Sequence, residues 1–200
     1  GDLANSASLP SLLERALGYV DQSRADSLTL INNAGVLQPI SPLERLEPQA
    51  VSTHLHVNLT APILLTGAFL KLTANFEKRR LVVNISSGAA RNPYPSWAPY
   101  CAAKAGLEMV TRVAAKEQES RSAPAKVIGL APGVVETQMQ ETIRATDTST
   151  FPLRDKFQQL KDEGKLFSPE ESATRLIRAM HDSEIVSGDV IDVRKRYSEP

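Results

Sequence analysis

The sequence has 200 residues, enough for one domain with a sizeable hydrophobic core. Its zero net charge argues against a nucleic-acid partner, and its single cysteine, Cys101, excludes an internal disulfide and favours a reducing, cytoplasmic compartment. The longest apolar run, 59–72, contains Pro62, Gly67 and Lys71, so we interpret it as a buried helix and expect no membrane span.

The spacing of apolar residues predicts helices and strands in alternation along a single domain, residues 1–200. The predicted helices cover residues 8–22, 47–74, 96–120 and 169–182, with shorter helical patches near 136–145 and 152–163. The predicted strands cover residues 27–32, 81–85, 126–131 and 186–193. Nearly continuous apolar strands separated by helices indicate an α/β fold with a parallel sheet covered on both faces.

Three of the predicted strands are followed by small or polar residues. These turns are Asn33-Ala34-Gly35, Ser86-Ser87-Gly88 and Pro132-Gly133. Each of them alone is an ordinary turn sequence. Ligands of open parallel sheets bind at the carboxyl ends of the strands, so the three turns together predict a binding site at that edge.

Tyr100 and Lys104 lie four residues apart in a predicted helix and therefore share one face of it. A cation close to a phenol favours the phenolate and lowers its pKa, which suits a tyrosine that acts as a general acid and base. The pair alone is weak evidence, because an exposed helix face with a lysine stem lying along it has the same spacing.

The combination of these features resembles the short-chain dehydrogenase/reductase family. A strand ending in Ser86-Ser87, a Tyr-x-x-x-Lys pair thirteen residues after Ser87, and a later Pro132-Gly133 turn with Thr137 four residues on are together similar to the family pattern. Asn32 and the Asn33-Ala34-Gly35 turn resemble the family's Asn-Asn-Ala-Gly motif. Asn58 matches the fourth catalytic position, and Asp2-Leu3 resembles the acidic and apolar pair that contacts adenine.

Three segments are further similar to sepiapterin reductase and its benzil-reducing microbial relatives. They are Trp97–Lys104 (WAPYCAAK), Ala131–Gln140 (APGVVETQMQ) and Ser187–Asp192 (SGDVID). In that subfamily an aspartate near the C-terminus anchors the pterin, and Asp192 occupies the matching place. The alternative interpretation of Asp192 is a solvated carboxylate near a strand end.

The resemblance implies a Rossmann-like doubly wound fold and the reduction of a carbonyl by hydride transfer from NADP(H). Tyr100 would donate the proton and Ser87 would hold the carbonyl oxygen, with Ser86 as the competing serine. Lys104 would lower the pKa of Tyr100 and bind the nicotinamide ribose. Asn58 would hold a water that relays protons to Lys104.

The resemblance also implies two sets of binding residues. The cofactor set is Asp2, Leu3, Asn33, Ala34, Gly35, Tyr100, Lys104, Pro132, Gly133, Val135 and Thr137. The substrate set is Ser87, Trp97, Tyr100, Met139 and Asp192. The polar, weakly periodic segment 136–165 would form a mobile lid over the substrate, or alternatively a plain surface excursion.

The sequence departs from the family pattern in one respect. The family begins with a strand and a glycine-rich turn that receives the pyrophosphate, and nothing here supplies them, so we expect an N-terminally truncated domain. The strand at 27–32 would then leave a bare edge, and NADPH rather than NADH is implied by the subfamily alone. A non-catalytic nucleotide-binding or scaffold protein is the alternative function, and a reductase of other ketones, steroids or acyl substrates is a third.

The remaining expectations concern metals and partners. His54 and His56 are two residues apart and would point in different directions on a helix, and His181 is isolated, so we expect no metal site. The family resemblance implies a small-molecule carbonyl substrate and a homodimer or homotetramer.

Overall fold

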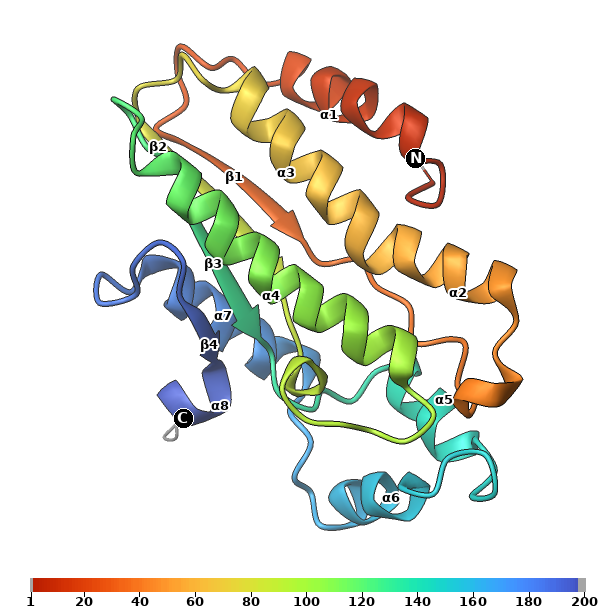
Figure 1. The fold of residues 1–200 in the computed structure, drawn as a ribbon. Helices are drawn as coiled ribbons and strands as arrows, with labels where there is room; N and C mark the ends of the chain where they lie inside the picture. The colour runs from red at the N-terminus through yellow and green to blue at the C-terminus, as the bar shows by residue number, and fades with distance from the viewer. Residues whose placement is uncertain (1, 198–200) are drawn as a thin grey trace.

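The structure, a computed structural model, describes residues 2–197, and within them four parallel strands form one sheet. The strands are β1 (Ser27–Asn32), β2 (Arg79–Ile85), β3 (Lys126–Ala131) and β4 (Val190–Asp192). They lie side by side in chain order, as Figure 1 shows. The predicted Rossmann-like α/β fold with a parallel sheet is therefore confirmed.

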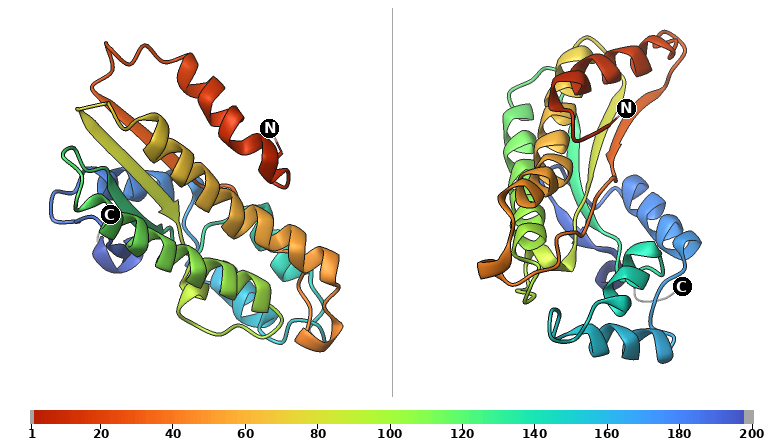
Figure 2. Two further views of the ribbon diagram at one scale, coloured as in Figure 1. Left: turned by 45° about the horizontal axis from the view of Figure 1, so that its top comes forward. Right: turned by 90° about the vertical axis from the view of Figure 1, so that its right-hand side faces the viewer.

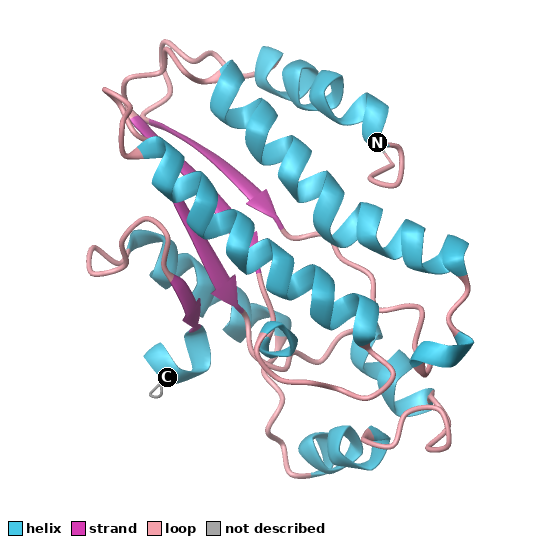
Figure 3. Cartoon of the chain, in the orientation of Figure 1, coloured by secondary structure: helices cyan, strands magenta, loops and turns pink. Residues whose placement is uncertain are grey.

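Helices cover both faces of this sheet. The long helices α3 (Ala61–Leu72) and α4 (Ala98–Gln118) lie on one face, α1 (Leu9–Gly18) packs against α3, and α7 (Pro169–His181) lies on the other face (Figure 2). The shorter helices, mapped in Figure 3, are η1 (Ser6–Ser8), η2 (Leu43–Arg45), α2 (Pro48–Leu55), η3 (His56–Thr60), η4 (Gly88–Ala90), α5 (Gln138–Ala145), α6 (Arg154–Asp162) and α8 (Val193–Arg196).

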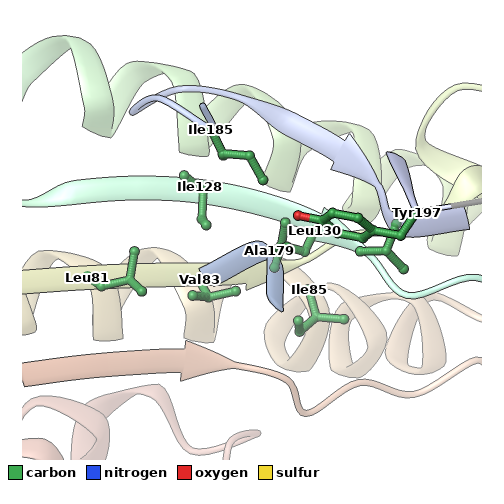
Figure 4. Packing of buried hydrophobic residues seen from close by; sticks show 9 residues of the cluster. Leu81, Val83, Ile85, Ile128, Leu130, Ala179, Ile185 and Tyr197 are labelled. Carbon is green, nitrogen blue, oxygen red and sulfur yellow. The ribbon is translucent and has the colours of Figure 1, made fainter. Parts of the chain in front are cut away.

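Two hydrophobic clusters hold the helices against the sheet. The cluster beneath α7 contains Leu81, Val83, Ile85, Ile128, Leu130, Ala179, Ile185, Val193 and Tyr197, most of which Figure 4 labels. The cluster beneath α3 and α4 contains Leu28, Phe69, Phe76, Val82, Ala114, Ala115 and Val127. Successive residues of β2 enter opposite clusters, because side chains alternate along a strand. The middle of β2 is thus buried on both faces. For that reason its apolar residues follow one another directly and do not alternate with polar ones.

A chain of buried amides and hydroxyls links β1, β2 and the helices. The Asn32 amide donates to Asn84 Oδ1 at 2.8 Å and to Thr66 Oγ1 at 3.1 Å. The Asn84 amide donates in turn to Thr111 Oγ1 at 2.9 Å. Asn32 and Asn84 are direct partners in the register of the two strands. The polar groups near the carboxyl ends of these strands are therefore satisfied inside the fold.

The strand β1 forms an outer edge of the sheet among the described residues. Its residues on the face away from α3, Thr29 and Ile31, are exposed, and 48% of the Ile31 surface is accessible. The expectation of a bare edge at this strand is confirmed for the part of the chain that the structure describes.

The prediction of a final strand over 186–193 is wrong over 186–189 and at Val193, where α8 begins. Residues 186–189 form a turn, in which the Val186 amide donates to Asp189 Oδ2 at 2.8 Å and Gly188 adopts a positive φ of 93°. Val190–Asp192 is the part that forms a strand beside β3, although the Gly188 amide and the Asp189 carbonyl also hydrogen-bond to Val127 and Gly129. The turn escaped detection because a Ser-Gly-Asp sequence inside an apolar segment occurs in strands with bulges as well as in turns.

Two predicted helices also differ from the observed ones. The predicted helix at 8–22 ends at Gly18, and the next two residues, Tyr19 and Val20, are exposed. The predicted helix at 47–74 is divided by one π-helical turn, His56–Thr60. Such turns insert an extra residue into the helical ladder and are frequent at functional sites.

The helical segment Pro48–Leu72 is long and apolar enough to cross a membrane by length and composition, with a mean hydropathy of 1.3. In this fold the same segment covers the sheet, with Ala61 and Phe69 buried and Ile63 exposed. Packing against the core therefore explains its apolar character in part, but only 28% of its most apolar stretch is buried, so the expectation of a buried helix is met only in part.

Candidate active site

A cavity of about 570 Å³ opens at the carboxyl ends of β1, β2 and β3. Its wall includes all three predicted turns and the predicted Tyr–Lys pair. The lining residues that the sequence predicted are Asn33, Gly35, Ser87, Trp97, Tyr100, Lys104, Pro132, Gly133, Val135, Thr137 and Met139. Parallel strands end at one edge, so segments far apart in the sequence meet here.

The two neighbouring serines at the end of β2 have different partners. The Ser86 hydroxyl is buried and donates to Glu108 Oε1 at 2.8 Å. Ser87 is only half-buried, and its Oγ accepts a hydrogen bond from the Ala89 amide at 3.2 Å, which leaves its own proton for another partner. The structure thus supports Ser87 over Ser86 as the serine available to a ligand.

Tyr100 and Lys104 lie in the first turns of α4, and both are buried. The Lys104 ammonium donates to the Ile85 carbonyl at 2.8 Å and lies 5.8 Å from the centre of the Tyr100 ring. Burial lowers the pKa of Lys104 to about 8. The lysine is therefore held beside the phenol by the end of β2, with its charge destabilised.

The pKa of Tyr100 moves in the direction opposite to our expectation. Burial raises it above its ordinary value and outweighs the hydrogen bond with Ser87, which acts in the other direction. The sequence analysis counted the nearby ammonium but had no measure of how completely the phenol is removed from water. Tyr100 consequently keeps its proton at neutral pH and is a phenol rather than a phenolate.

Asn58 lies in the π-helical turn and is fully buried behind the cavity wall. Its Oδ1 accepts from the Val36 amide at 3.1 Å, and its Nδ2 donates to the Val36 carbonyl at 2.8 Å. The side chain thus binds the backbone just after Gly35 in both directions. In this structure Asn58 therefore holds the loop that follows β1 by hydrogen bonds. The predicted role of Asn58 in a proton relay through water remains untested.

Gly35 separates Asn58 from the cavity. A Cβ atom at this position would lie 2.9 Å from Asn58 Oδ1 and 3.8 Å from Lys104 Nζ. The first distance is shorter than side chains tolerate, so only glycine allows the loop to approach Asn58 this closely. The glycine of the Asn-Ala-Gly turn therefore has a steric reason in this fold.

The turn after β3 forms the opposite wall. Gly133 has a φ of 93°, a region that favours glycine. The Pro132 carbonyl accepts from the Ser172 hydroxyl at 3.2 Å, and the Phe167 amide donates to the Val134 carbonyl at 2.9 Å. Hydrogen bonds to α7 and to the segment that precedes α7 thus hold this turn in place.

The segment after this turn packs over the cavity through α5 and α6. Trp97 is stacked between Phe151 and Tyr94, at centroid distances of 4.8 and 4.9 Å, and meets Phe157 at 5.5 Å. Ile143, from α5, belongs to the same buried cluster. The predicted lid is observed as a packed roof, and its predicted mobility remains untested.

A comparison with known families bears on this arrangement. The family model described as "short chain dehydrogenase" matches residues 1–148, which is more than half of the chain. The chain is a short-chain dehydrogenase. The resemblance inferred from the motifs is therefore confirmed, and members of the family are oxidoreductases that use nicotinamide cofactors.

Two groups of relatives of this dehydrogenase agree with the narrower resemblance. The benzil reductase ((S)-benzoin forming) of Bacillus cereus is 39% identical over 192 residues, which cover 96% of this chain and 77% of that enzyme. The sepiapterin reductase of Xenopus tropicalis is 34% identical over 197 residues, which cover 96% and 72%. Among solved structures, the enzyme KRED1-Pglu has a TM-score of 0.79 and 25% identity, with 96% of this chain and 77% of that chain covered.

Five residues of the predicted sets do not line the cavity of this dehydrogenase. They are Asp2, Leu3, Ala34, Asn58 and Asp192. Asp2 and Leu3 precede α1, and Asp2 Oδ1 accepts from the Ala4 amide at 2.9 Å. The Asp192 carboxylate is bound by Arg194, which lines the cavity in its place.

Sequence reasoning missed His54, a buried residue of α2 that supports Asn58. Its Nδ1 lies 2.7 Å from the Gln38 carbonyl, which only accepts, so Nδ1 carries the proton and Nε2 accepts from Asn58 Nδ2 at 3.1 Å. Burial holds the pKa of His54 below its ordinary value despite the bond to Gln38, so the ring is neutral. The ring also meets Tyr100 edge-on at 6.0 Å. The spacing of four residues between His54 and Asn58 is the sequence signal that could have indicated it.

We expect His54→Phe to lower kcat/KM about tenfold, because phenylalanine keeps the ring contact with Tyr100 but releases the Asn58 amide. The matched control is His56→Phe, since the one hydrogen bond of the His56 ring within residues 2–197 is to the Ser52 carbonyl in the preceding turn. Steady-state kinetics of both variants check this expectation. Equal activities of the two variants would show that His54 does not position Asn58.

We expect Gly35→Ala to lower both the activity and the free energy of unfolding, the latter by about 1–3 kcal/mol. Asn58 cannot move away cheaply, because its amide oxygen accepts from the Val36 amide and its amide nitrogen lies within 3.2 Å of the Val36 carbonyl and two His54 acceptors. Gly67→Ala in α3 is the control, since a Cβ there meets nothing within 4 Å. We expect that control to stabilise the protein by about 0.5–1 kcal/mol, as measured by urea unfolding.

Proposed function

We propose that this short-chain dehydrogenase reduces a carbonyl group of a small molecule to an alcohol with NADPH. The observation that carries the proposal is the meeting of Ser87, Tyr100 and Lys104 in one cavity, with the serine hydroxyl beside a protonated phenol. The benzil and sepiapterin reductases among the relatives support a vicinal diketone or a pterin side chain as the substrate class.

The cavity walls fit a nicotinamide cofactor. The cavity lining combines apolar side chains such as Ile85 with the Ser87 hydroxyl and the Lys104 ammonium, which suits a flat ring and its ribose. The bound cofactor supplies the hydride. The residues that would hold the cofactor are Asp2, Leu3, Asn33, Ala34, Gly35, Tyr100, Lys104, Pro132, Gly133, Val135 and Thr137. The choice of NADPH over NADH rests on the resemblance to the reductases named above.

Each residue of the site has a separate task in the proposed reaction. Ser87 donates a hydrogen bond to the substrate carbonyl oxygen, which gains negative charge as the carbonyl is reduced. Tyr100 donates its proton to this oxygen, and its raised pKa keeps the phenol protonated throughout the neutral range. Lys104 lies beside the phenol and stabilises the phenolate left after proton transfer.

We further propose that the protein is cytoplasmic and forms a homodimer or homotetramer, without a nucleic-acid or membrane partner. Exposed apolar side chains on α3 and α4, among them Ile63, Met109 and Val113, support an association through these helices. The single cysteine supports a reducing compartment.

The decisive experiment is the consumption of NADPH, followed by its absorbance, with benzil and with sepiapterin. Turnover of either substrate that requires NADPH, with formation of the corresponding alcohol, supports the proposal. Binding of NADPH without turnover of either compound would overturn it and favour a non-catalytic nucleotide-binding protein.

A further inference from the structure

Arg194 crosses the mouth of the cavity. Its Cγ and Cδ atoms lie 3.0 Å from the position that a Cβ on Gly133 would occupy, and its Nη2 lies 4.0 Å from the corresponding position on Gly88. The side chain therefore runs from the turn after β3 to the turn after β2. Gly88 follows Ser87 directly, so the guanidinium reaches the neighbourhood of the serine that would hold the reacting carbonyl.

Asp192 holds one edge of this guanidinium. Nε of Arg194 donates to Asp192 Oδ1 at 3.1 Å and Nη2 donates to Oδ2 at 2.8 Å, while the Arg194 backbone amide donates to Oδ1 at 3.0 Å. Burial raises the pKa of Asp192, but its bonds with Arg194 and the charge of Arg194 outweigh burial and leave the pKa below its usual value. The carboxylate is thus ionised, and both of its oxygens are engaged.

The other edge of the guanidinium remains available. An arginine side chain has five N–H groups, and two of them donate to Asp192. The remaining three donate to no group of residues 2–197, and 42% of the Arg194 side chain is accessible. A guanidinium fixed along one edge by a carboxylate presents a preorganised pair of donors along the other.

We infer that Arg194 is the residue that selects the substrate, by donating hydrogen bonds to a neutral oxygen next to the reacting carbonyl. The inference rests on the carbonyl reduction proposed above and narrows its substrate class to 1,2-diketones. A pterin presents N–H donors that require a free carboxylate, and the carboxylate of Asp192 is occupied. The charge of Asp192 also offsets that of Arg194, so the pair favours a neutral acceptor over a substrate carboxylate.

The test compares benzil with deoxybenzoin, which has the same two rings and lacks the second carbonyl oxygen. Trp97 is the only tryptophan of the chain and lines the cavity, so quenching of its fluorescence reports binding without turnover. We expect Arg194→Met to weaken benzil binding and its kcat/KM about 10- to 100-fold, and to change both values for deoxybenzoin less than about twofold.

Two further variants distinguish the loss of substrate recognition by Arg194 from a general disturbance of the structure around it. The double variant Asp192→Asn/Arg194→Met removes both charges, so it should show the same selective loss without an unpaired buried carboxylate. Arg196→Met removes a cation of the same helix that pairs with Asp182 and Glu184, and it should leave both ligands unaffected.

Equal losses for benzil and deoxybenzoin, no loss of benzil binding in Arg194→Met, or no binding of benzil to the wild type would each overturn the inference. Tighter binding of the anion phenylglyoxylate than of benzil would overturn the preference for a neutral oxygen. The carbonyl reductase proposal fails by a different result, namely no NADPH turnover with any of these ketones. In that case the fluorescence titrations still decide whether Arg194 contacts the second oxygen.

Discussion

Tyr100→Phe is expected to lower kcat/KM for carbonyl reduction about 100- to 10,000-fold, the range typical of a lost general acid. The buried phenol holds its proton at neutral pH, and among the cavity groups it is the acid that contacts Ser87. Phenylalanine removes only the hydroxyl and keeps the ring contacts with His54 and Trp97. The fold should therefore persist, and the measurement is steady-state kinetics together with thermal unfolding.

The control for this variant is Tyr19→Phe, because Tyr19 is 91% exposed and lies just beyond α1. We expect its activity to equal that of the wild type. A Tyr100→Phe variant that keeps more than about a tenth of the wild-type activity would contradict the role of Tyr100 as proton donor.

Lys104→Met is expected to abolish activity and, at the same time, to stabilise the fold at pH 7. Burial lowers the pKa of Lys104 from 10.5 to about 8, so the folded protein bears an unfavourable charge below pH 8. This pKa difference means that the buried charge destabilises the folded protein by about 3 kcal/mol, which the variant would regain. The variant also loses the hydrogen bond from Lys104 to the Ile85 carbonyl, at a cost of about 1 kcal/mol. We therefore expect a net gain of about 2 kcal/mol.

The pH dependence of this gain has a definite sign. Between pH 8 and 10.5 the unfolded chain binds more protons at this lysine than the folded protein does, so wild-type stability rises with pH across that range relative to the variant. The advantage of Lys104→Met should thus shrink from pH 8 upward and disappear by pH 10.5. Urea unfolding of both proteins over this range tests it, and a pH-independent difference would show that burial does not destabilise the charged lysine.

The sequence predicted most of the fold because its strands have clear boundaries. The observed strands β1 and β3 have the predicted limits, since each is an apolar run closed by Asn33 or Pro132. The position of the site at the strand ends followed from the parallel sheet, because parallel strands end at one edge, whereas its individual residues came from the family resemblance.

The parts that the sequence did not predict depend on solvation and on short side-chain contacts. The direction of the Tyr100 pKa follows from burial beneath the aromatic roof, which no local spacing reveals. The pairing of Asp192 with Arg194 depends on the geometry of α8, which the sequence does not reveal. The turn at 186–189 lies within an apolar segment and was therefore predicted as strand. His54 was weighed only as a metal ligand, although its neutral ring supports Asn58.

The buried Asn32–Asn84 pair has a consequence for how the strands align. Parallel strands made of similar apolar residues can slide past each other at little cost, since every register buries comparable surface. A shift of β1 by two residues would separate the two amides and leave Asn84 Oδ1 without its donor, at a cost of about 1–3 kcal/mol. The Asn32–Asn84 pair therefore fixes the register of β1 and β2. Because the register sets where the two strands end, it also sets the relative positions of Gly35 and Ser87.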